Sequence, residues 1–321
     1  MARATGVSRQ TVSRAINNMT QIDPATRDRV LAVARDMGYR PSRHARGMMR
    51  RSTTTVGLVI PDVLNPFFTE VVAGALEAAK SRGWQLIMYT TDSALDQEKP
   101  LSESIAAQVD ACIAFLLDPD AIAAIAGSGI PFVLLGNEDQ AGSVSKVRID
   151  FESGLREAFD HLAARGHLHI GMIDDRKRTA SGRPDARTRL YTTAAMEAGL
   201  RIEPEWIQQA TNSIDGGAAA MERMMREAPE VTAILCYNDI LAIGAMRHAM
   251  ARGLAIPESC AFIGVDDIPI SALVDPPLTT VHVDKRRIGQ AAIEQLAAQM
   301  SSGASMADTV IRTRLVVRAS T

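Results

Sequence analysis

The chain has 321 residues, of which 46% are hydrophobic and 22% charged, and its formal net charge is −2. That length exceeds a single ordinary hydrophobic core, so we expect two or three domains. No apolar run approaches the roughly 20 residues that a bilayer-spanning helix needs, and the N-terminus lacks the apolar core of a signal peptide. The composition therefore argues against the membrane and secreted classes, and we expect a cytoplasmic protein.

The small net charge hides a strong asymmetry along the chain. Residues 1–51 contain eleven arginines against three aspartates, a net charge of +8, whereas the remaining residues carry a net charge of −10. A basic segment attached to an acidic body indicates a polyanion partner for the segment alone. A solvated charged tail is the alternative, but the segment has helical patterning that such a tail would lack.

The first helix is predicted within the stretch GVSRQTVSRAIN. Ser8 suits the N-cap, because its hydroxyl can accept a hydrogen bond from an early backbone N–H. Val12, Ala15 and Ile16 recur at helical spacing and would form the inner face. The polar side chains outside that face are Arg9, Gln10, Ser13 and Arg14. Because Arg and Gln can make paired hydrogen bonds to guanine and adenine edges, the outer face suits DNA.

A second helix is predicted with Asp23 as N-cap, Pro24 in the first helical position and Gly38 at its exit. The segment YRPSRHARGMMRR then contains five arginines, and Pro41 can start a short helix in it. Such a segment is too short and too charged to fold alone, so we expect it to become ordered on a partner. Neutralisation of phosphates would supply the affinity.

From Thr55 onward the pattern changes to alternating strands and helices. Runs rich in β-branched residues, such as TVGLVIP, predict strands, and amphipathic stretches predict helices. The expected strands are 55–61, 84–91, 110–117, 131–136, 169–174, 232–237, 260–267 and 309–318, and the expected helices are 66–82, 94–107, 119–127, 152–165, 185–198, 216–227 and 239–252. Repeated βαβ units predict an α/β fold of two doubly wound, parallel-sheet subdomains.

Ligands of open parallel sheets bind beyond the carboxyl ends of the strands. In this chain those ends carry the stretches PDVLNPFF, GNEDQ, DDRKR, YNDI and VDDIP. Carboxylates and amides hydrogen-bond hydroxyl groups, and rings such as those of Phe67 and Phe68 can cover the apolar faces of sugars. The strand ends therefore predict a binding site for a polyol.

The motifs do not favour catalysis. No GxSxG, GxxxxGK[ST], GxGxxG or HExxH motif occurs, and we expect no metal and no cofactor. Asp266 and Asp267 would lie on an extended segment, where neighbouring side chains point in opposite directions, so they make a poor acid–base pair. The cysteines at positions 112, 236 and 260 are far apart in apolar runs, which predicts buried, inert thiols.

The order of these motifs resembles the lac repressor family (LacI/GalR) of bacterial transcription regulators. The residues that carry the resemblance are GVSRQTVSRAINN, TRDRVLAVARDMGYRPSRHAR, VGLVIPDVLNPFF, HLAARGHLHIGMI, YNDILAIGAMRHAMARGLAIPESCAFIGVDDIP and PPLTTVHVD. They run from Ala2 to about Leu315, so the resemblance covers essentially the whole chain. One such motif alone would be weak, whereas this set in the same order is specific.

The resemblance implies an all-α, helix-turn-helix DNA-binding domain at residues 1–40, with its recognition helix in the major groove. The side chains expected on DNA are Arg9, Gln10 and Arg14, which would read bases, and Thr11, Ser13 and Asn17, which would support base or phosphate contacts. Packing on the helix surface is the alternative for Thr11 and Ser13. Relatives carry a longer stretch before this motif, so we expect a truncated first helix and hypothesise that the natural start lies upstream.

The segment 41–54 resembles the family's hinge helix, which folds when two protomers meet on the minor groove of the operator. Its expected DNA contacts are Arg43, Ala45, Arg46 and Met48. Where the family usually places a leucine wedge between base pairs, this chain has Met48, a more flexible but chemically reasonable wedge. Gly47 weakens an already marginal helix, so ordering of the hinge would cost more here. Alternatively, Met48 only packs against its dimer mate.

The body resembles the family's effector module, which is itself similar to periplasmic sugar-binding proteins. The residues implied as effector contacts are Phe67, Phe68, Asn137, Phe151, Arg187, Asn238, Asp266 and Lys285. Both phenylalanines would stack on the ligand, although Phe68 alternatively belongs to the core. Lys285 stands where some relatives have an aromatic residue, which indicates a more polar or anionic effector. Leu190 replaces the family's usual glycine, a departure in the segment that carries Arg187.

The resemblance also implies that the chain crosses between the two subdomains near 150–155, 282 and 312. One subdomain would then comprise 55–154 and 283–312, and the other 155–282 and 313–321. An effector that prefers one arrangement of the subdomains would shift the population toward it and change the spacing of paired hinges. Whether the effector promotes or releases DNA binding stays open.

The predicted function is a ligand-responsive, DNA-binding transcriptional repressor with a sugar or sugar acid as effector. Its expected partners are a double-stranded, pseudo-palindromic operator, the effector and a second copy of the chain. The last strand ends at Arg318 and no heptad tail follows it, so we expect a homodimer. Two alternatives stay open: a sugar-binding module that no longer binds DNA, and an enzyme on the same core. The basic N-terminal segment favours the repressor.

Overall fold

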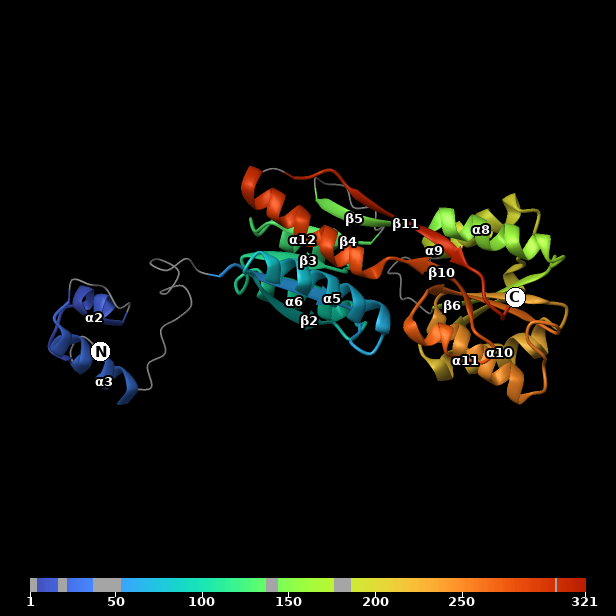
Figure 1. Cartoon of the computed structure of the whole chain (residues 1–321), viewed down its shortest axis with the longest axis horizontal. Coiled ribbons are helices and arrows are strands. Elements are labelled where there is room, and N and C mark those ends of the chain that lie inside the picture. The colour runs from blue at the N-terminus through green and yellow to red at the C-terminus, as the bar shows by residue number, and fades with distance from the viewer. Residues whose placement is uncertain (1–4, 17–21, 37–52, 137–143, 176–185, 304) are drawn as a thin grey trace. The chain divides into compact units, whose positions relative to one another are not determined.

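The computed structural model describes residues 5–16, 22–36, 53–136, 144–175, 186–303 and 305–321. The chain forms two compact units, Met1–Thr54 and Thr55–Thr321, which we call the head and the core and describe separately (Figure 1). Among the described helices, none is long and apolar enough to cross a membrane.

Two capped helices, α2 (Arg9–Ile16) and α3 (Pro24–Asp36), form the described part of the head. The side chains of Ser8 and Asp23 each accept a hydrogen bond from the backbone N–H three residues later, at 3.0 Å in both cases. Each bond satisfies one of the free N–H groups in the first turn of its helix. Both predicted N-caps are therefore confirmed.

A small apolar cluster joins the two helices of the head. Val12 and Ala15 of α2, which the helical spacing placed on the inner face, are buried together with Val30 of α3. The predicted helix exit at Gly38 and the predicted hinge helix lie outside the described residues.

The strands described in the core form one 11-stranded sheet in the order β2-β1-β3-β4-β5-β11-β10-β9-β8-β6-β7. The strands are β1 (Thr55–Ile60), β2 (Gln85–Thr90), β3 (Ala111–Ala114), β4 (Phe132–Leu135), β5 (Ser145–Asp150), β6 (Ile170–Asp175), β7 (Ile207–Ala210), β8 (Ala233–Cys236), β9 (Ala261–Asp266), β10 (Thr279–Val283) and β11 (Thr309–Val316). Every neighbouring pair is parallel except β10 with β11. Helices connect most of the successive parallel strands, so the core is α/β and doubly wound, as predicted.

Strand β11 joins two lobes of the core, because its residues 309–312 pair with β5 and its residues 313–316 pair with β10. The first lobe contains β1–β5 and the second contains β6–β10. The helices of the first lobe are α5 (Pro66–Ser81), α6 (Leu95–Ile105), α7 (Pro119–Ala126) and α12 (Lys285–Ser302), and those of the second are α8 (Phe151–Ala164), α9 (Ala186–Glu197), α10 (Ile214–Glu227) and α11 (Asp239–Ala251). The predicted residue boundaries of the subdomains stay a prediction.

Polar side chains begin most of the core helices. The N-cap side chains that accept a backbone hydrogen bond are Asn65, Asp118, Asp150, Ser213, Asn238 and Asp284. Each follows a strand or a short loop, so the caps fix the point at which each parallel strand turns into its helix. These turns place polar side chains at the carboxyl ends of the strands.

Helix α12 packs closely on α5, although the sequence analysis did not predict it. A Cβ added at Gly74 would lie 2.1 Å from the carbonyl oxygen of Arg286, and one added at Gly289 would lie 2.1 Å from that of Val71. Only glycine permits such an approach of two helix backbones. The contact anchors the start of α12 in the first lobe.

The predicted core elements are all present, with ends that differ by a few residues. Strands β5, β7 and β10 and helix α12 were not predicted. Polar residues explain the omission of β7, which reads IQQA, and α12 buries Lys285, Gln295 and Gln299 among its apolar residues, which weakens its apolar period.

Candidate DNA-binding helix and effector site

Helix α2 carries the residues that the sequence assigned to base reading. Arg9, Gln10, Ser13 and Arg14 all lie on it, but only the side chain of Arg14 is among those described, and it is half-buried. The Thr11 hydroxyl lies 2.8 Å from that of Ser8, so it takes part in the helix cap. The other predicted DNA contacts, which lie outside the described residues, are Asn17, Arg43, Ala45, Arg46 and Met48.

Three phenylalanines cluster where α5 begins and β3 ends. The ring centroids of Phe67 and Phe68 are 5.1 Å apart, and Phe115 lies 6.1 Å from the first and 5.1 Å from the second, all edge to face. Phe67 is 7% exposed and Phe68 is half-buried. The N–H of Phe67 donates to the side chain of Asn65 at 2.9 Å, which fixes the turn. The sequence analysis missed Phe115, whose signal was its place after a buried strand beside β1.

A chain of polar side chains crosses the strand ends of the second lobe. Asn238 caps α11 through its Oδ1, and its Nδ2 donates to the Oδ1 of Asn212 at 2.8 Å. Asn212 in turn donates to Asp175 Oδ2 at 3.4 Å. Asn238 is 2% exposed, so its amide orientation is fixed by partners on both sides. Asn212 and Asp175 were not among the predicted site residues, although Asp175 lies in the quoted stretch DDRKR.

The turn after β9 is not extended, and this corrects the sequence analysis. Asp266 has a φ of 112° and Asp267 a φ of 54°, so both adopt left-handed backbone conformations that favour glycine. The expected alternation of the two side chains therefore does not hold. Two successive left-handed aspartates are costly and must be held in place by their surroundings.

Lys285, the first residue of α12, holds this turn. It is 2% exposed, and its ammonium donates to the carbonyl oxygen of Asp266 at 2.5 Å and to that of Asp267 at 2.8 Å. A carboxylate oxygen of Glu70, on α5, lies 3.8 Å away. The site therefore brings Lys285 and Asp266 together, but the described contacts of the ammonium are to protein groups.

The carboxylate of Asp267 has two side-chain partners, a guanidinium group and an imidazole ring. Arg318 donates to one oxygen at 2.6 Å, and the Nδ1 of His282 lies 2.8 Å from the other. Burial raises the pKa of Asp267, but the hydrogen bonds from Arg318 and His282 outweigh it and lower the pKa below its ordinary 3.8. The side chain of Asp267 is therefore charged, and its partners Arg318 and His282 lie in the second lobe.

Asp239 lies directly below the turn and is fully buried. Its carboxylate accepts hydrogen bonds from the N–H of Ile268 at 2.8 Å, the hydroxyl of Ser271 at 2.6 Å and the hydroxyl of Thr280 at 2.5 Å. Burial raises the pKa of Asp239 from 3.8 to about 6, although these three hydrogen bonds oppose the rise. The sequence analysis did not single out Asp239.

The remaining predicted effector residues occupy different environments. Phe151 begins α8 and is 6% exposed, within the main apolar core. Arg187 lies in the first turn of α9, but its side chain is outside the described set, as is all of Asn137. Leu190, which replaces the expected glycine, packs partly buried against the core.

The three cysteines are buried, as predicted. Burial raises the pKa of the Cys112 and Cys260 thiols to about 12 and that of Cys236 in the same direction, so none is a nucleophile at neutral pH. Within the described residues, no group of three or more His, Cys, Asp or Glu side chains is placed to hold a metal ion.

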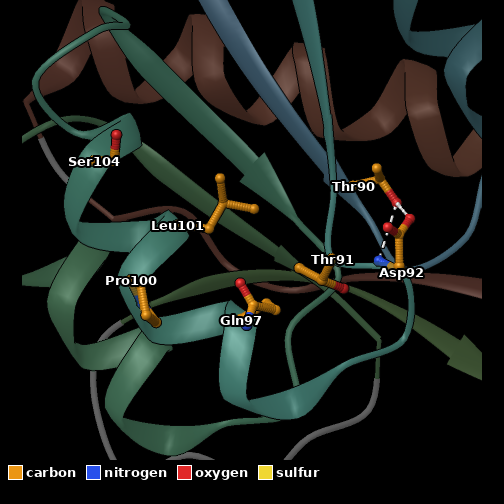
Figure 2. A pocket seen from close by; sticks show the side chains of 7 residues that line it. All are labelled: Thr90, Thr91, Asp92, Gln97, Pro100, Leu101 and Ser104. Atoms are coloured by element: carbon orange, nitrogen blue, oxygen red, sulfur yellow. Dashed lines mark hydrogen bonds between the residues drawn. The ribbon is translucent and has the colours of Figure 1, made fainter.

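A separate cavity of about 360 Å³ lies beyond the carboxyl end of β2, beside α6 (Figure 2). Figure 2 shows Pro100, Leu101 and Gln97 of α6 on one side and Thr91 on the other. The Thr90 hydroxyl donates to Asp92 Oδ1 at 3.1 Å at its edge. Among the predicted effector residues whose side chains are described, none lines this cavity.

A capped, arginine-bearing helix in the head and a two-lobed core with polar strand ends define a class: regulators that bind DNA and respond to a small ligand. Two family models match the sequence, "Bacterial regulatory proteins, lacI family" over residues 1–42 and "Periplasmic binding protein-like domain" over residues 159–321. The chain belongs to the lacI family. It is a ligand-responsive transcriptional regulator and not an enzyme, as predicted.

Relatives and solved structures agree with this assignment. The chain is 31% identical over 300 residues to the HTH-type transcriptional repressor PurR of Aliivibrio salmonicida (strain LFI1238), covering 92% of this chain and 90% of the relative. It is 30% identical over 304 residues to catabolite control protein A of Priestia megaterium, covering 94% and 91%. A complex of the transcriptional regulator CelR with cellobiose has a TM-score of 0.75 and 29% identity, covering 100% and 98%. A lac repressor dimer bound to operator and the anti-inducer ONPF has a TM-score of 0.75 and 27% identity, covering 99% and 97%.

Proposed function

We propose that the effector binds between the two lobes, at the carboxyl ends of their strands. The observation that supports this is that the ammonium of Lys285 lies close to groups of both lobes. Its ammonium lies 2.5 Å from the Asp266 carbonyl of the second lobe and 3.8 Å from Glu70, which lies in the same turn of α5 as Phe67 and Phe68 in the first lobe. The Lys285 side chain therefore contacts the turn at Asp266–Asp267 and lies close to the first turn of α5, which carries the phenylalanines.

The chemistry of the two sides suits a polyol. Phe68 offers a half-buried ring from the first lobe, and Asp266, Asn238 and Arg187 offer hydrogen-bonding groups from the second. A ring that covers an apolar sugar face and polar groups that pair with hydroxyls together give affinity and orientation. Phe67 supports the ring of Phe68, and Phe151 and Asn137 are further proposed contacts.

The head would carry this response to DNA. Arg9, Gln10 and Arg14 would read base edges in the major groove, and the hinge residues would contact the minor groove. We propose a homodimer on a pseudo-palindromic operator in the cytoplasm, with a sugar or sugar acid as effector. Similar solved structures support this proposal, because they are complexes with cellobiose, with lactose, and of a repressor dimer with its operator.

A thermal-shift screen of the full chain tests the effector site, because a ligand that binds the folded state raises its melting temperature. Cellobiose, lactose, gluconate and galacturonate sample the neutral and anionic classes. We expect at least one to raise the melting temperature, and we expect Arg187→Ala to abolish that rise. Arg189→Ala, two residues along the same helix, is the matched control and should keep the shift. An unchanged titration in Arg187→Ala would contradict the assignment.

A further inference from the structure

Lys285 belongs structurally to the first lobe. It opens α12, whose backbone approaches α5 so closely at Gly74 and Gly289 that a Cβ would overlap a carbonyl oxygen of the other helix. Its neighbour Arg286 also pairs with α5, through Glu77 at 3.5 Å, but both of those side chains are exposed. Lys285 instead turns inward and is 2% exposed.

The hydrogen bonds of Lys285 go to the other lobe. Their acceptors are the carbonyl oxygens of Asp266 and Asp267, the two residues whose φ angles of 112° and 54° lie in the left-handed region. Neither residue is glycine, so the turn carries a backbone cost that its surroundings must offset. A buried ammonium that loses water needs such acceptors, and hydrogen bonds from a charged donor are about twice as strong as neutral ones.

We propose that Lys285 is a positioning residue that fixes the left-handed turn at Asp266–Asp267 and fastens it to the first lobe. Arg318 and His282 contact the carboxylate of Asp267, whereas Lys285 contacts the backbone of the turn. The turn is therefore stabilised through both its side chain and its backbone. The orientation of Asp266 then depends on a residue of the opposite lobe. The prediction that Lys285 also indicates an anionic effector stays a prediction, because an ammonium has three N–H donors and these two carbonyl groups take two of them.

The functional consequence rests on the proposed role of Asp266 as an effector contact. A change in the lobe arrangement that moves α12 would move the lysine and release the turn. Effector binding at Asp266 and the relation between the lobes would then be coupled through one side chain. Stabilisation of the turn by Lys285 requires neither effector nor DNA, so it can be tested without them.

Hydrogen exchange of the full chain, followed by mass spectrometry without sugar or DNA, tests the inference. The relevant amides are those of Asp267 and Ile268, which donate to Thr280 Oγ1 at 3.3 Å and to Asp239 Oδ2 at 2.8 Å. We expect Lys285→Met to accelerate exchange in the peptide 264–270 by about tenfold or more, since two charge-assisted hydrogen bonds are lost. Lys285→Gln, a milder change, should accelerate it by a smaller factor.

Two control variants separate the turn from the contact between α5 and α12. Arg286→Met removes a charge from the same helical turn and breaks a pair with α5, and Glu70→Gln removes the carboxylate beside Lys285. Both should leave the exchange of peptide 264–270 within about twofold of the wild type. If either matches Lys285→Met, or if Lys285→Gln leaves the rate unchanged, the proposed positioning role is wrong.

A rescue experiment distinguishes positioning from a general loss of stability. Asp266→Gly removes the cost of the left-handed conformation, because glycine adopts that φ without strain. In this background the lysine substitution should accelerate exchange by a clearly smaller factor than in the wild type, a non-additive result typical of coupled residues. Equal factors in both backgrounds would show that Lys285 does not act on the turn. Neither result would bear on whether the protein binds sugar or DNA.

Discussion

The buried carboxyl group of Asp239 makes stability depend on pH in a direction opposite to that of most acidic residues. Burial raises its pKa to about 6, above the ordinary 3.8, so the folded chain binds this proton more tightly than the unfolded chain. The contribution of Asp239 to the free energy of unfolding is therefore fully present below pH 3.8 and is lost as the pH rises through 6. A difference of about two pKa units corresponds to about 3 kcal/mol of unfolding free energy.

Asp239→Asn isolates this contribution, since asparagine has nearly the same shape and does not titrate. Other carboxylates contribute equally to both proteins, so the wild-type minus variant difference in unfolding free energy should fall by about 3 kcal/mol from about pH 3 to about pH 7. Urea unfolding at a series of pH values measures it. Trp206 lies in the second lobe with Asp239, so a Trp84→Phe background, which leaves one tryptophan, reports on that lobe.

A wild-type minus variant difference in unfolding free energy that does not change across this pH range would refute the reasoning. It would mean that the three hydrogen bonds to Asp239 fully offset the cost of burying its charge. A difference that rises with pH would mean that the hydrogen bonds outweigh burial and that folding lowers this pKa.

Three further predictions concern the head, the helix contact and the thiols. Ser8→Ala removes the N-cap of α2 and should destabilise that helix by about 1 kcal/mol, measured as earlier melting of the head by circular dichroism. Gly74→Ala forces a methyl group against the Arg286 carbonyl and should cost about 1–3 kcal/mol in urea unfolding, whereas Gly127→Ala, whose Cβ would lie 3.1 Å from its nearest neighbour, should cost less. All three cysteines should resist a thiol reagent in the native protein and react fully in urea, and rapid native labelling would contradict their burial.

Most of the fold could be predicted from sequence because its signals are local. Alternating β-branched runs and amphipathic stretches marked the strands and helices, and the N-cap residues Ser8 and Asp23 were read correctly from their side-chain chemistry. Helix α12 was not predicted because polar residues such as Lys285, Gln295 and Gln299 share its buried positions with apolar ones, which weakens its apolar period. Its place in the fold depends on contact with α5, which lies about two hundred residues earlier in the chain.

The site was harder to predict because it depends on contacts between distant segments. Asn238 and Asp266 follow strands that were predicted, so their positions at the strand ends followed from topology. The left-handed turn could not be foreseen, since neither Asp266 nor Asp267 is glycine and the lysine that stabilises it follows another strand. Phe115 and Asn212 complete clusters whose other members come from different loops, so the place of Phe115 after a buried strand did not show which side chains it meets.

We expect a small molecule bound to the core to change the affinity of the head for DNA. Fluorescence anisotropy measures this directly, by titrating the full chain into a labelled upstream DNA fragment with and without the sugar found by thermal shift. We expect sequence-specific binding that weakens steeply with salt, since the N-terminal segment carries a net charge of +8. We also expect the sugar to change the affinity at least about fivefold in one direction. Specific binding that the sugar leaves unchanged, or no specific binding to any such fragment, would contradict the claim.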